Sequence, residues 1–203
     1  MDREAFLGAY GIPADRDAVL FGIAARFNPV KDIPTLLRAF GVVAATYPQA
    51  RLLLAGDGED RKRLEEMARE CAPAGTVFFL GWVRDTDSFY NAIDVNVLTS
   101  LSETFPYALT EGGKMRCATI ATRVGGIPHM VADGETGLLF EPGDADQLAR
   151  YMEQMIADPD RRRRLGTAMY QRTADRFSLE SMVRTQLGIY DRLLGGADRM
   201  DPA

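Results

Sequence analysis

The sequence places two cations five residues apart, directly after an apolar segment. Arg26 and Lys31 bound the segment Arg26-Phe-Asn-Pro-Val-Lys31, which follows the apolar run 19–25 and leads into a helical pattern. A guanidinium and an ammonium group this close together suit a diphosphate, whose negative charge is spread over several oxygens. The simpler alternative is that both are solvated surface cations, which is the usual state of arginine and lysine.

Two carboxylates form a second candidate group. Glu103 and Glu111 lie eight residues apart, the first in a loop and the second in a helix expected to begin at Pro106. Because a carboxylate accepts two hydrogen bonds from neighbouring hydroxyls, the pair suits a sugar and a ribose diol. A glycosidase would use two carboxylates as acid and as nucleophile or base, but a diphosphate site has no role in hydrolysing a neutral glycoside. The structural alternative is that both are surface glutamates near a helix start.

Alternating strands and helices must position these residues. Short, continuous apolar runs are typical of strands that are buried on both faces. Six such runs cover residues 19–25, 52–55, 77–80, 95–98, 119–122 and 138–140. Between them, apolar residues recur at helical spacing, most clearly over residues 33–47, where Asp32 is expected to cap the helix. This predicts an α/β fold with one Rossmann-like, doubly wound parallel sheet of about six strands and helices on both faces.

The segment after residue 140 is predicted to be entirely helical. Asp144, with Gln147 three residues later, and Ser178 provide side chains that can cap helices. We expect one domain over residues 1–194 and a disordered tail over residues 195–203. In such sheets ligands bind at the carboxyl ends of the strands, so the loops that carry the cations and carboxylates should meet there.

Composition limits the possible partners. The 203 residues include 24 Lys+Arg and 29 Asp+Glu, a formal net charge of −5, which argues against a general affinity for nucleic acid. Cys71 and Cys117 cannot form a disulfide framework and have no zinc-ligand spacing, so we expect no metal site. Apolar residues nowhere run to membrane-spanning length, and the N-terminus has no signal pattern. These features predict a cytoplasmic protein whose phosphate ligand is held by a local cluster.

Seven short motifs occur in series along the chain. They are Arg26 to Lys31, Leu53-Leu-Ala-Gly-Asp-Gly58, Phe79-Leu-Gly-Trp-Val83, Asp94-Val-Asn-Val-Leu-Thr-Ser100, Glu103 with Glu111, Val124-Gly-Gly-Ile-Pro128 and Asp133-Gly-Glu-Thr-Gly-Leu-Leu-Phe140. Together they resemble the C-terminal, nucleotide-sugar-binding domain of a retaining glycosyltransferase of family 4, with the GT-B fold. The resemblance covers about residues 14–194.

The resemblance implies a role for each residue of the candidate site. Arg26 and Lys31 would neutralise the donor diphosphate, and Glu103 would contact hydroxyls of the donor sugar; these three form the expected catalytic group. Glu111 would bind the ribose. Two loop segments would complete the donor site: the backbone of Thr104, Phe105 and Pro106 beside the sugar and phosphates, and Gly81, Trp82 and Val83 against the base.

The resemblance also implies partners. The donor would be a UDP-, GDP- or ADP-sugar, transfer would retain the anomeric configuration, and neither metal nor cofactor would be needed. A glycan or lipid-linked sugar acceptor would bind an N-terminal domain that this sequence lacks, so we expect the chain alone to transfer sugar negligibly. The basic stretch formed by the arginines at 161–164, 172 and 176 favours a solvated face, with a peripheral contact at the inner membrane face as the alternative.

Two other functions compete with this interpretation. One is a stand-alone nucleotide-sugar-binding or regulatory module without catalysis, which the mass of the natural protein would distinguish. The other is a dinucleotide-dependent oxidoreductase, but the turn Gly56-Asp-Gly58 lacks the third glycine of the dinucleotide fingerprint.

The chain departs from the family pattern at three places. Asp32 stands where the family commonly has glycine, which puts a negative charge near the expected diphosphate. Thr104 replaces another frequent glycine. Gly112 and Gly113 lie inside the helix expected after Pro106, where each costs about 1 kcal/mol relative to alanine. They indicate either close backbone packing or a break in the helix.

Overall fold

The computed structural model describes residues 1–13, 15 and 17–197. Within these residues lies one six-stranded parallel sheet of strand order β3-β2-β1-β4-β5-β6. The strands are β1 (Val19–Ala24), β2 (Ala50–Ala55), β3 (Val77–Gly81), β4 (Val95–Leu98), β5 (Ala118–Thr122) and β6 (Leu138–Phe140). The predicted fold class is therefore confirmed, and the reversal of strand order lies between β1 and β4.

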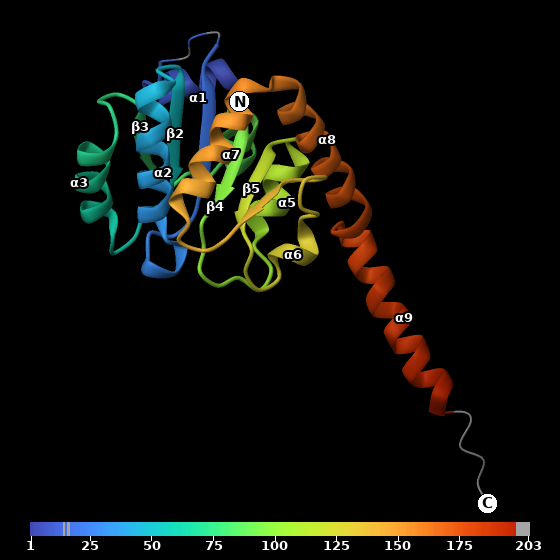
Figure 1. Cartoon of the computed structure of the whole chain (residues 1–203). Coiled ribbons are helices and arrows are strands. Elements are labelled where there is room, and N and C mark those ends of the chain that lie inside the picture. The colour runs from blue at the N-terminus through green and yellow to red at the C-terminus, as the bar shows by residue number, and fades with distance from the viewer. Residues whose placement is uncertain (14, 16, 198–203) are drawn as a thin grey trace, which may run out of the picture.

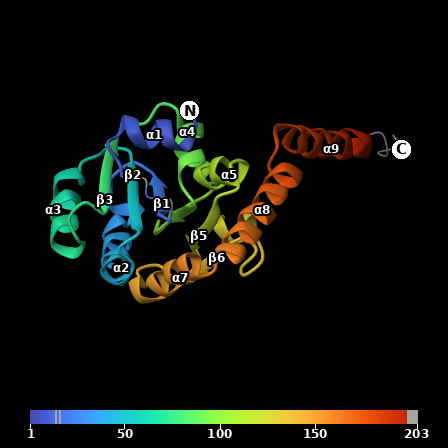
Figure 2. The same cartoon turned by 90° about the horizontal axis from the view of Figure 1, so that it is seen from above.

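Helices cover both faces of the sheet (Figures 1 and 2). On one face α2 (Ile33–Thr46), α3 (Arg61–Cys71) and α7 (Ala145–Ala157) pack together. On the other face lie α1 (Arg3–Ala9), α4 (Thr86–Ala92) and α5 (Tyr107–Lys114). The remaining helical elements are η1 (Pro29–Lys31), α6 (Ile127–Met130), α8 (Pro159–Arg176) and α9 (Leu179–Ala197). Successive residues of a strand point to opposite faces, so the apolar strands build a core on each side.

One strand differs from the sequence-based expectation. The run 77–80 was expected to be buried on both faces, but every residue of β3 is only half-buried. β3 lies at one edge of the sheet, where it pairs with β2 alone and borders a hollow beneath α3. β6 lies at the opposite edge but is buried, because α7 packs against it. The short helix α1 was not predicted either, although its Phe6 and Leu7 are completely buried.

Three helix starts show where side-chain capping succeeds and fails. Asp144 Oδ1 accepts a hydrogen bond from the Gln147 backbone N–H at 2.8 Å, and Ser178 Oγ accepts one from the Ser181 N–H at 3.2 Å, as expected. The expectation for Asp32 is wrong, because its side chain makes no capping hydrogen bond. Asp32 has φ 41° and ψ 44°, which is the left-handed region that glycine adopts most readily.

Close packing explains the two glycines within α5. A Cβ on Gly112 would lie 2.7 Å from Asn96 Nδ2 of β4, and one on Gly113 would overlap Thr173 Oγ1 of α8. The helix continues through both positions to Lys114. The first of the two alternatives, close backbone packing, is therefore confirmed, and the small residues let α5 approach β4 and α8.

The last helix projects away from the body of the molecule (Figures 1 and 2). Its large apolar side chains are exposed. They are Leu179, Met182, Val183, Leu187, Ile189, Tyr190, Leu193 and Leu194. The helix continues to Ala197, so the expected tail is wrong for residues 195–197, because propagating an existing helix is easier than starting one. Residues 198–203 lie outside the described residues.

Candidate functional site

Lys31 and Glu103 meet at the carboxyl end of the sheet. Lys31 ends η1 after β1, and Glu103 lies in the loop after β4, so the two residues flank the point where the strand order reverses. The Lys31 ammonium donates to Glu103 Oε1 at 2.5 Å, with 26% and 12% of the two side chains exposed. Ser100 Oγ donates to the same oxygen at 2.7 Å. The sequence predicted both charged residues but not their ion pair.

A cavity of about 210 Å³ surrounds this group, and we call it the Glu103 cavity. It is lined by residues from the carboxyl ends of β1 and β4 and from the start of α5. They are Ile23, Ala24, Ala25, Lys31, Leu98, Ser100, Glu103, Pro106, Tyr107, Ala108 and Glu111. The cavity therefore joins two predicted groups, the Lys31 cation and the two carboxylates.

Hydrogen bonds tie the loops after β1 and β4 into one unit. Thr99 Oγ1 donates to the Lys31 carbonyl at 2.7 Å, and the Leu101 N–H donates to the Val30 carbonyl at 2.8 Å. Thr122 Oγ1 of β5 donates to the Ser100 carbonyl at 2.6 Å. Both ends of the ion pair are thus held by the backbone as well as by their charges.

Two glycines hold the main chain of Glu103. The Gly126 N–H donates to the Glu103 carbonyl at 2.9 Å. Gly125 has φ +50°, and a Cβ there would overlap the same carbonyl, while a Cβ on Gly126 would overlap the Thr104 carbonyl. Thr104 itself has no positive φ, so its replacement of a frequent glycine leaves the backbone unstrained.

A larger cavity of about 820 Å³ adjoins the first, and we call it the Trp82 cavity. The two cavities share Ala24, Ala25 and Glu111. The remaining lining residues of the Trp82 cavity are Arg26, Ala55, Gly56, Asp57, Gly58, Trp82, Val83, Thr86 and Phe89. Arg26 is exposed and forms no ion pair with any residue that the structure describes, and 77% of Trp82 is exposed. This cavity presents an unpaired cation beside a flat aromatic surface.

Glu111 has a buried neighbour that the sequence did not indicate. Tyr90 of α4 is completely buried, and its hydroxyl has no hydrogen-bond partner among the described residues. Burial first, and then the negative charge of Glu111, raise the pKa of Tyr90. The phenol therefore stays protonated and places a neutral donor near the carboxylate that joins the two cavities.

Most of the predicted site residues come together. Lys31, Glu103, Pro106 and Glu111 line the Glu103 cavity, and Arg26, Trp82, Val83 and Glu111 line the Trp82 cavity. Three predicted residues line neither cavity: Gly81, Thr104 and Phe105. Tyr107 and Asp57 line them without having been predicted. The position of Tyr107, directly after Pro106 at a helix start, was the signal that could have found it.

The predicted residues outside the cavities have structural contacts. The Phe105 ring packs edge-on against Tyr107 and Phe177, with centroids 5.6 and 5.8 Å apart. The Gly81 carbonyl accepts a hydrogen bond from the Gly56 N–H at 2.7 Å, and its φ of +68° turns the chain toward Trp82. These residues therefore shape the loops around the cavities.

The buried thiol and the arginine stretch take no part in this site. Burial raises the pKa of the Cys117 thiol to about 12, so it stays protonated at neutral pH. The solvated-face interpretation is wrong for Arg162, which is about half-buried, donates to the Met155 carbonyl and has a pKa lowered chiefly by burial. The reason is the packing of the start of α8 beside α7, which brings that guanidinium against the backbone.

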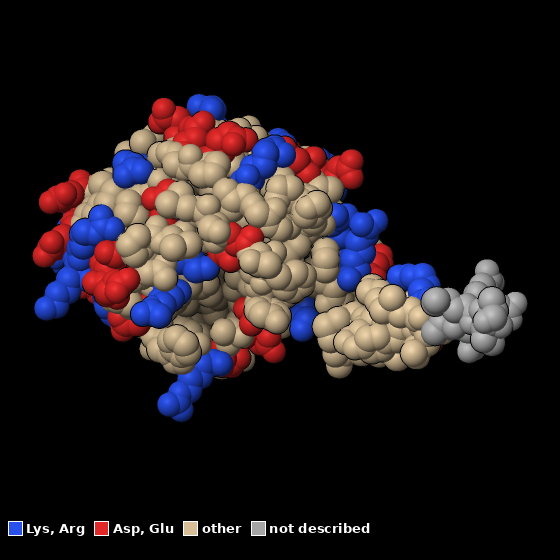
Figure 3. Space-filling view, turned by 90° about the horizontal axis from the view of Figure 1, so that it is seen from below, with Lys and Arg blue, Asp and Glu red and all other residues tan. Residues whose placement is uncertain are grey.

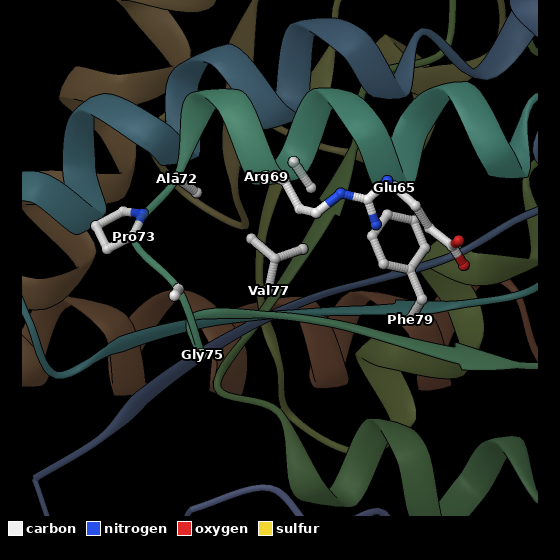
Figure 4. Close-up of a pocket in the computed structure, with 9 residues that line it drawn as sticks. Glu65, Arg69, Ala72, Pro73, Gly75, Val77 and Phe79 are labelled. Atoms are coloured by element: carbon white, nitrogen blue, oxygen red, sulfur yellow. The ribbon is translucent and has the colours of Figure 1, made fainter.

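A further hollow of about 320 Å³ lies between α3 and β3 (Figure 4). Val77 and Phe79 of β3 face the helix there, and Glu65 and Arg69 of α3 extend over them. The charges of Arg69 and Glu65 offset each other above these apolar side chains, so the hollow has no excess positive charge that would bind an anion.

The face at the carboxyl ends of the strands carries interspersed positive and negative side chains (Figure 3). Anion binding there depends on individual residues.

Comparison with known proteins identifies the family. The family model described as glycosyl transferases group 1 matches residues 3–172. The chain belongs to this family. The lipopolysaccharide core biosynthesis glycosyltransferase LpsE of Rhizobium meliloti is 34% identical to this group 1 domain over 175 residues, which are 86% of this chain and 50% of LpsE.

Solved structures share the fold of this group 1 domain. The C-terminal domain of the group 1 family protein LpcC from Francisella tularensis has a TM-score of 0.78 at 25% identity, covering 88% of this chain and 94% of that one. Anabaena Alr3699/HepE, solved in complex with UDP-glucose, has a TM-score of 0.84 at 22% identity, covering 94% and 52%. The resemblance to the C-terminal domain of a GT-B glycosyltransferase is thereby confirmed.

Two further findings concern the length of this group 1 domain and its helices. The chain spans about half the length of the curated relatives it matches. None of the helices within the described residues combines the length and apolar character needed to cross a bilayer.

Proposed function

We propose that the chain binds the nucleotide-sugar donor of a retaining, family 4 glycosyl transfer. The observation that supports this is the pair of adjoining cavities, which are lined by the cations Arg26 and Lys31, the predicted carboxylates Glu103 and Glu111, and the exposed Trp82. A nucleotide sugar has the matching sequence of groups: a base, a ribose diol, a diphosphate and a sugar. In this proposal the base would lie at Trp82, the ribose at Glu111, the diphosphate at the cations and the sugar at Glu103.

Arg26 and Lys31 would neutralise the diphosphate. The bond that breaks leaves negative charge on the departing nucleoside diphosphate, and cations placed beside that charge stabilise it. Lys31 is already held at 2.5 Å from Glu103, whereas Arg26 has no ion pair among the described residues. The proposal assigns no metal ion to the site, because these two side chains supply the positive charge.

Carboxylates would select the two diols. Glu103 would accept hydrogen bonds from hydroxyls of the donor sugar, and Glu111 would accept them from the ribose. Trp82 and Val83 would lie against the base, with Gly81 shaping their turn. The backbone of residues 104–106 would border the sugar and phosphates.

The acceptor would bind elsewhere. Because the chain spans about half of its curated relatives, we infer that a further domain holds the acceptor, a glycan or a lipid-linked sugar. The name of LpsE, which is one of those relatives, points to polysaccharide biosynthesis as the setting. A cytoplasmic location, with a peripheral contact at the inner membrane face as its alternative, completes the proposal. The 203-residue chain alone is then expected to transfer sugar negligibly, and measurable turnover with donor and acceptor would contradict this division.

A thermal-shift series tests donor binding. UDP, GDP, ADP and their sugar conjugates are added to the chain, and a ligand at a hundredfold its dissociation constant should stabilise it by about 2.7 kcal/mol. Arg26→Ala should weaken nucleotide binding about 10- to 100-fold, since it removes hydrogen bonds between charged groups. Arg184→Ala, which removes an exposed arginine of α9, is the matched control. No shift with any nucleotide, or a shift that is indifferent to Arg26, would overturn the proposal.

A further inference from the structure

Ser100 lines the Glu103 cavity, and neither the motifs nor the family comparison assigns it a role. The residue is 2% exposed, and its hydroxyl donates to Glu103 Oε1 at 2.7 Å. Its carbonyl accepts the 2.6 Å hydrogen bond from Thr122 Oγ1, which fixes its backbone to β5. The hydroxyl is therefore a neutral donor whose position does not depend on the charge of Lys31.

Glu103 divides its two carboxylate oxygens between different tasks. Oε1 accepts from both Lys31 and Ser100, whereas Oε2 has no hydrogen bond with any residue that the structure describes. Oε2 is therefore available to accept a hydrogen bond from a ligand hydroxyl. The position of Oε2 depends on the two hydrogen bonds that Lys31 and Ser100 donate to Oε1.

The two donors to Oε1 would respond differently to a diphosphate. Phosphate oxygens compete with Glu103 for the Lys31 ammonium, because both are anions that seek the same cation. A neutral hydroxyl has no comparable charge attraction for the diphosphate, and the backbone that carries the Ser100 hydroxyl is anchored to β5 by the hydrogen bond from Thr122 Oγ1. Ser100 would then be the contact that keeps Glu103 in place while Lys31 is shared.

We propose that Ser100 is a positioning residue that holds the Glu103 carboxylate against the donor sugar when the diphosphate engages Lys31. This inference rests on the proposed function, in which Glu103 contacts sugar hydroxyls and Lys31 contacts the diphosphate. It predicts that the hydroxyl of Ser100 matters for the sugar of the donor and not for its nucleotide.

Calorimetric titration of Ser100→Ala tests this separation. The probes are UDP, GDP and ADP, followed by the glucose, galactose and N-acetylglucosamine conjugates of whichever nucleotide binds best. Ser100→Ala should leave the dissociation constant of the nucleoside diphosphate within about twofold and weaken the best sugar conjugate about tenfold, the size expected for one hydrogen bond to a charged group. Ser102→Ala is the matched control, because Ser102 is an exposed serine of the same loop with no hydrogen bond among the described residues. It should change neither constant.

A double variant separates positioning from direct contact. If Ser100 acts through Glu103, then Ser100→Ala should cause no further loss of sugar-conjugate affinity in a Glu103→Ala background. Independent losses that add would mean that Ser100 contacts the donor itself, and would overturn the proposal. An equal loss for nucleotide and sugar conjugate would overturn it as well, since that pattern is structural damage.

The result for the unsubstituted chain distinguishes the two proposals. If no nucleotide binds, the proposed function fails and this inference fails with it. If the nucleotide binds but none of its sugar conjugates binds differently from it, donor binding stands and the role of Ser100 is wrong.

Discussion

The two adjoining cavities differ in how their charged groups are held. In the Glu103 cavity the Lys31 ammonium already has a carboxylate partner, and hydrogen bonds fix both loops that carry the pair. In the Trp82 cavity, Arg26 has no ion pair among the described residues and Trp82 is largely exposed. One half of the site is organised by contacts within the protein, and the other presents groups that can rearrange around a ligand.

This difference matches the tasks of the two halves in the proposed reaction. Charge develops where the bond between sugar and phosphate breaks, and groups that are fixed beforehand stabilise that charge best. The base and ribose take no part in bond breaking, so contacts with them add affinity to substrate and transition state alike. The Glu103 cavity thus supplies the fixed groups, and Arg26 is the group of the adaptable Trp82 cavity that would also act on the developing charge.

The largest expected effect comes from breaking the backbone of the fixed half. Gly125→Ala puts a Cβ onto the Glu103 carbonyl at φ +50°, so the loop must move. We expect the free energy of unfolding to fall by about 3 kcal/mol and binding of the sugar conjugate to be lost. Chemical denaturation and calorimetric titration measure the two effects.

Gly134→Ala provides the control for this prediction. Gly134 has φ +77° with no atom within 4 Å of an added Cβ, so the variant keeps the backbone strain and leaves out the clash. It should lose about 1–2 kcal/mol of stability and bind donor normally. Equal losses in both variants would show that the contact between Gly125 and Glu103 is unimportant.

A smaller effect is expected in the adaptable half. Trp82→Ala should weaken nucleotide binding about tenfold, because stacking of a base on an aromatic ring contributes about 1–3 kcal/mol. The free energy of unfolding should change by less than about 0.5 kcal/mol, since 77% of the residue is exposed.

Inorganic pyrophosphate, which has a diphosphate group but no base, distinguishes the contribution of the base to binding from that of the diphosphate. Its affinity should be the same for Trp82→Ala and for the unsubstituted chain, measured by calorimetric titration. Tyr190→Ala, which truncates an exposed aromatic residue of α9, should affect neither ligand. A parallel loss of pyrophosphate binding in Trp82→Ala would place Trp82 in the fixed half and erase the distinction between the cavities.

The fold could be read from the sequence because its strands are buried. The runs 95–98 and 138–140 coincide with β4 and β6, since a strand covered on both faces must be continuously apolar. The edge strand β3 shows the limit, because the same kind of run is only half-buried where it borders a hollow beneath α3, whereas β6 at the opposite edge is buried against α7. Helix α1 was not predicted because its seven residues include too few apolar positions to show helical periodicity.

The candidate site could be predicted as a set of residues but not as a set of contacts. The motifs named Lys31 and Glu103, yet their ion pair joins residues 72 positions apart and depends on how β1 and β4 lie side by side. The motif Asp94 to Ser100 included the serine, but nothing in its spacing shows that its hydroxyl donates to Glu103. Residue type is local information, whereas pairing is a property of the folded chain.

The smallest effect is expected at Asp32, which tests whether excess negative charge limits the fixed half. Asp32 follows Lys31 directly, and Asp32→Asn removes its charge while keeping a residue that tolerates the left-handed conformation. We expect the nucleoside diphosphate to bind about twofold more tightly at low ionic strength, with the gain fading as salt screens it. Asp32→Gly removes the same charge and also relieves the backbone, so equal gains in both variants would identify charge as the cause. A gain in Asp32→Gly alone would assign it to the backbone. No gain in either would mean that the carboxylate does not influence the diphosphate, and that the ion pair with Glu103 alone sets the charge available at Lys31.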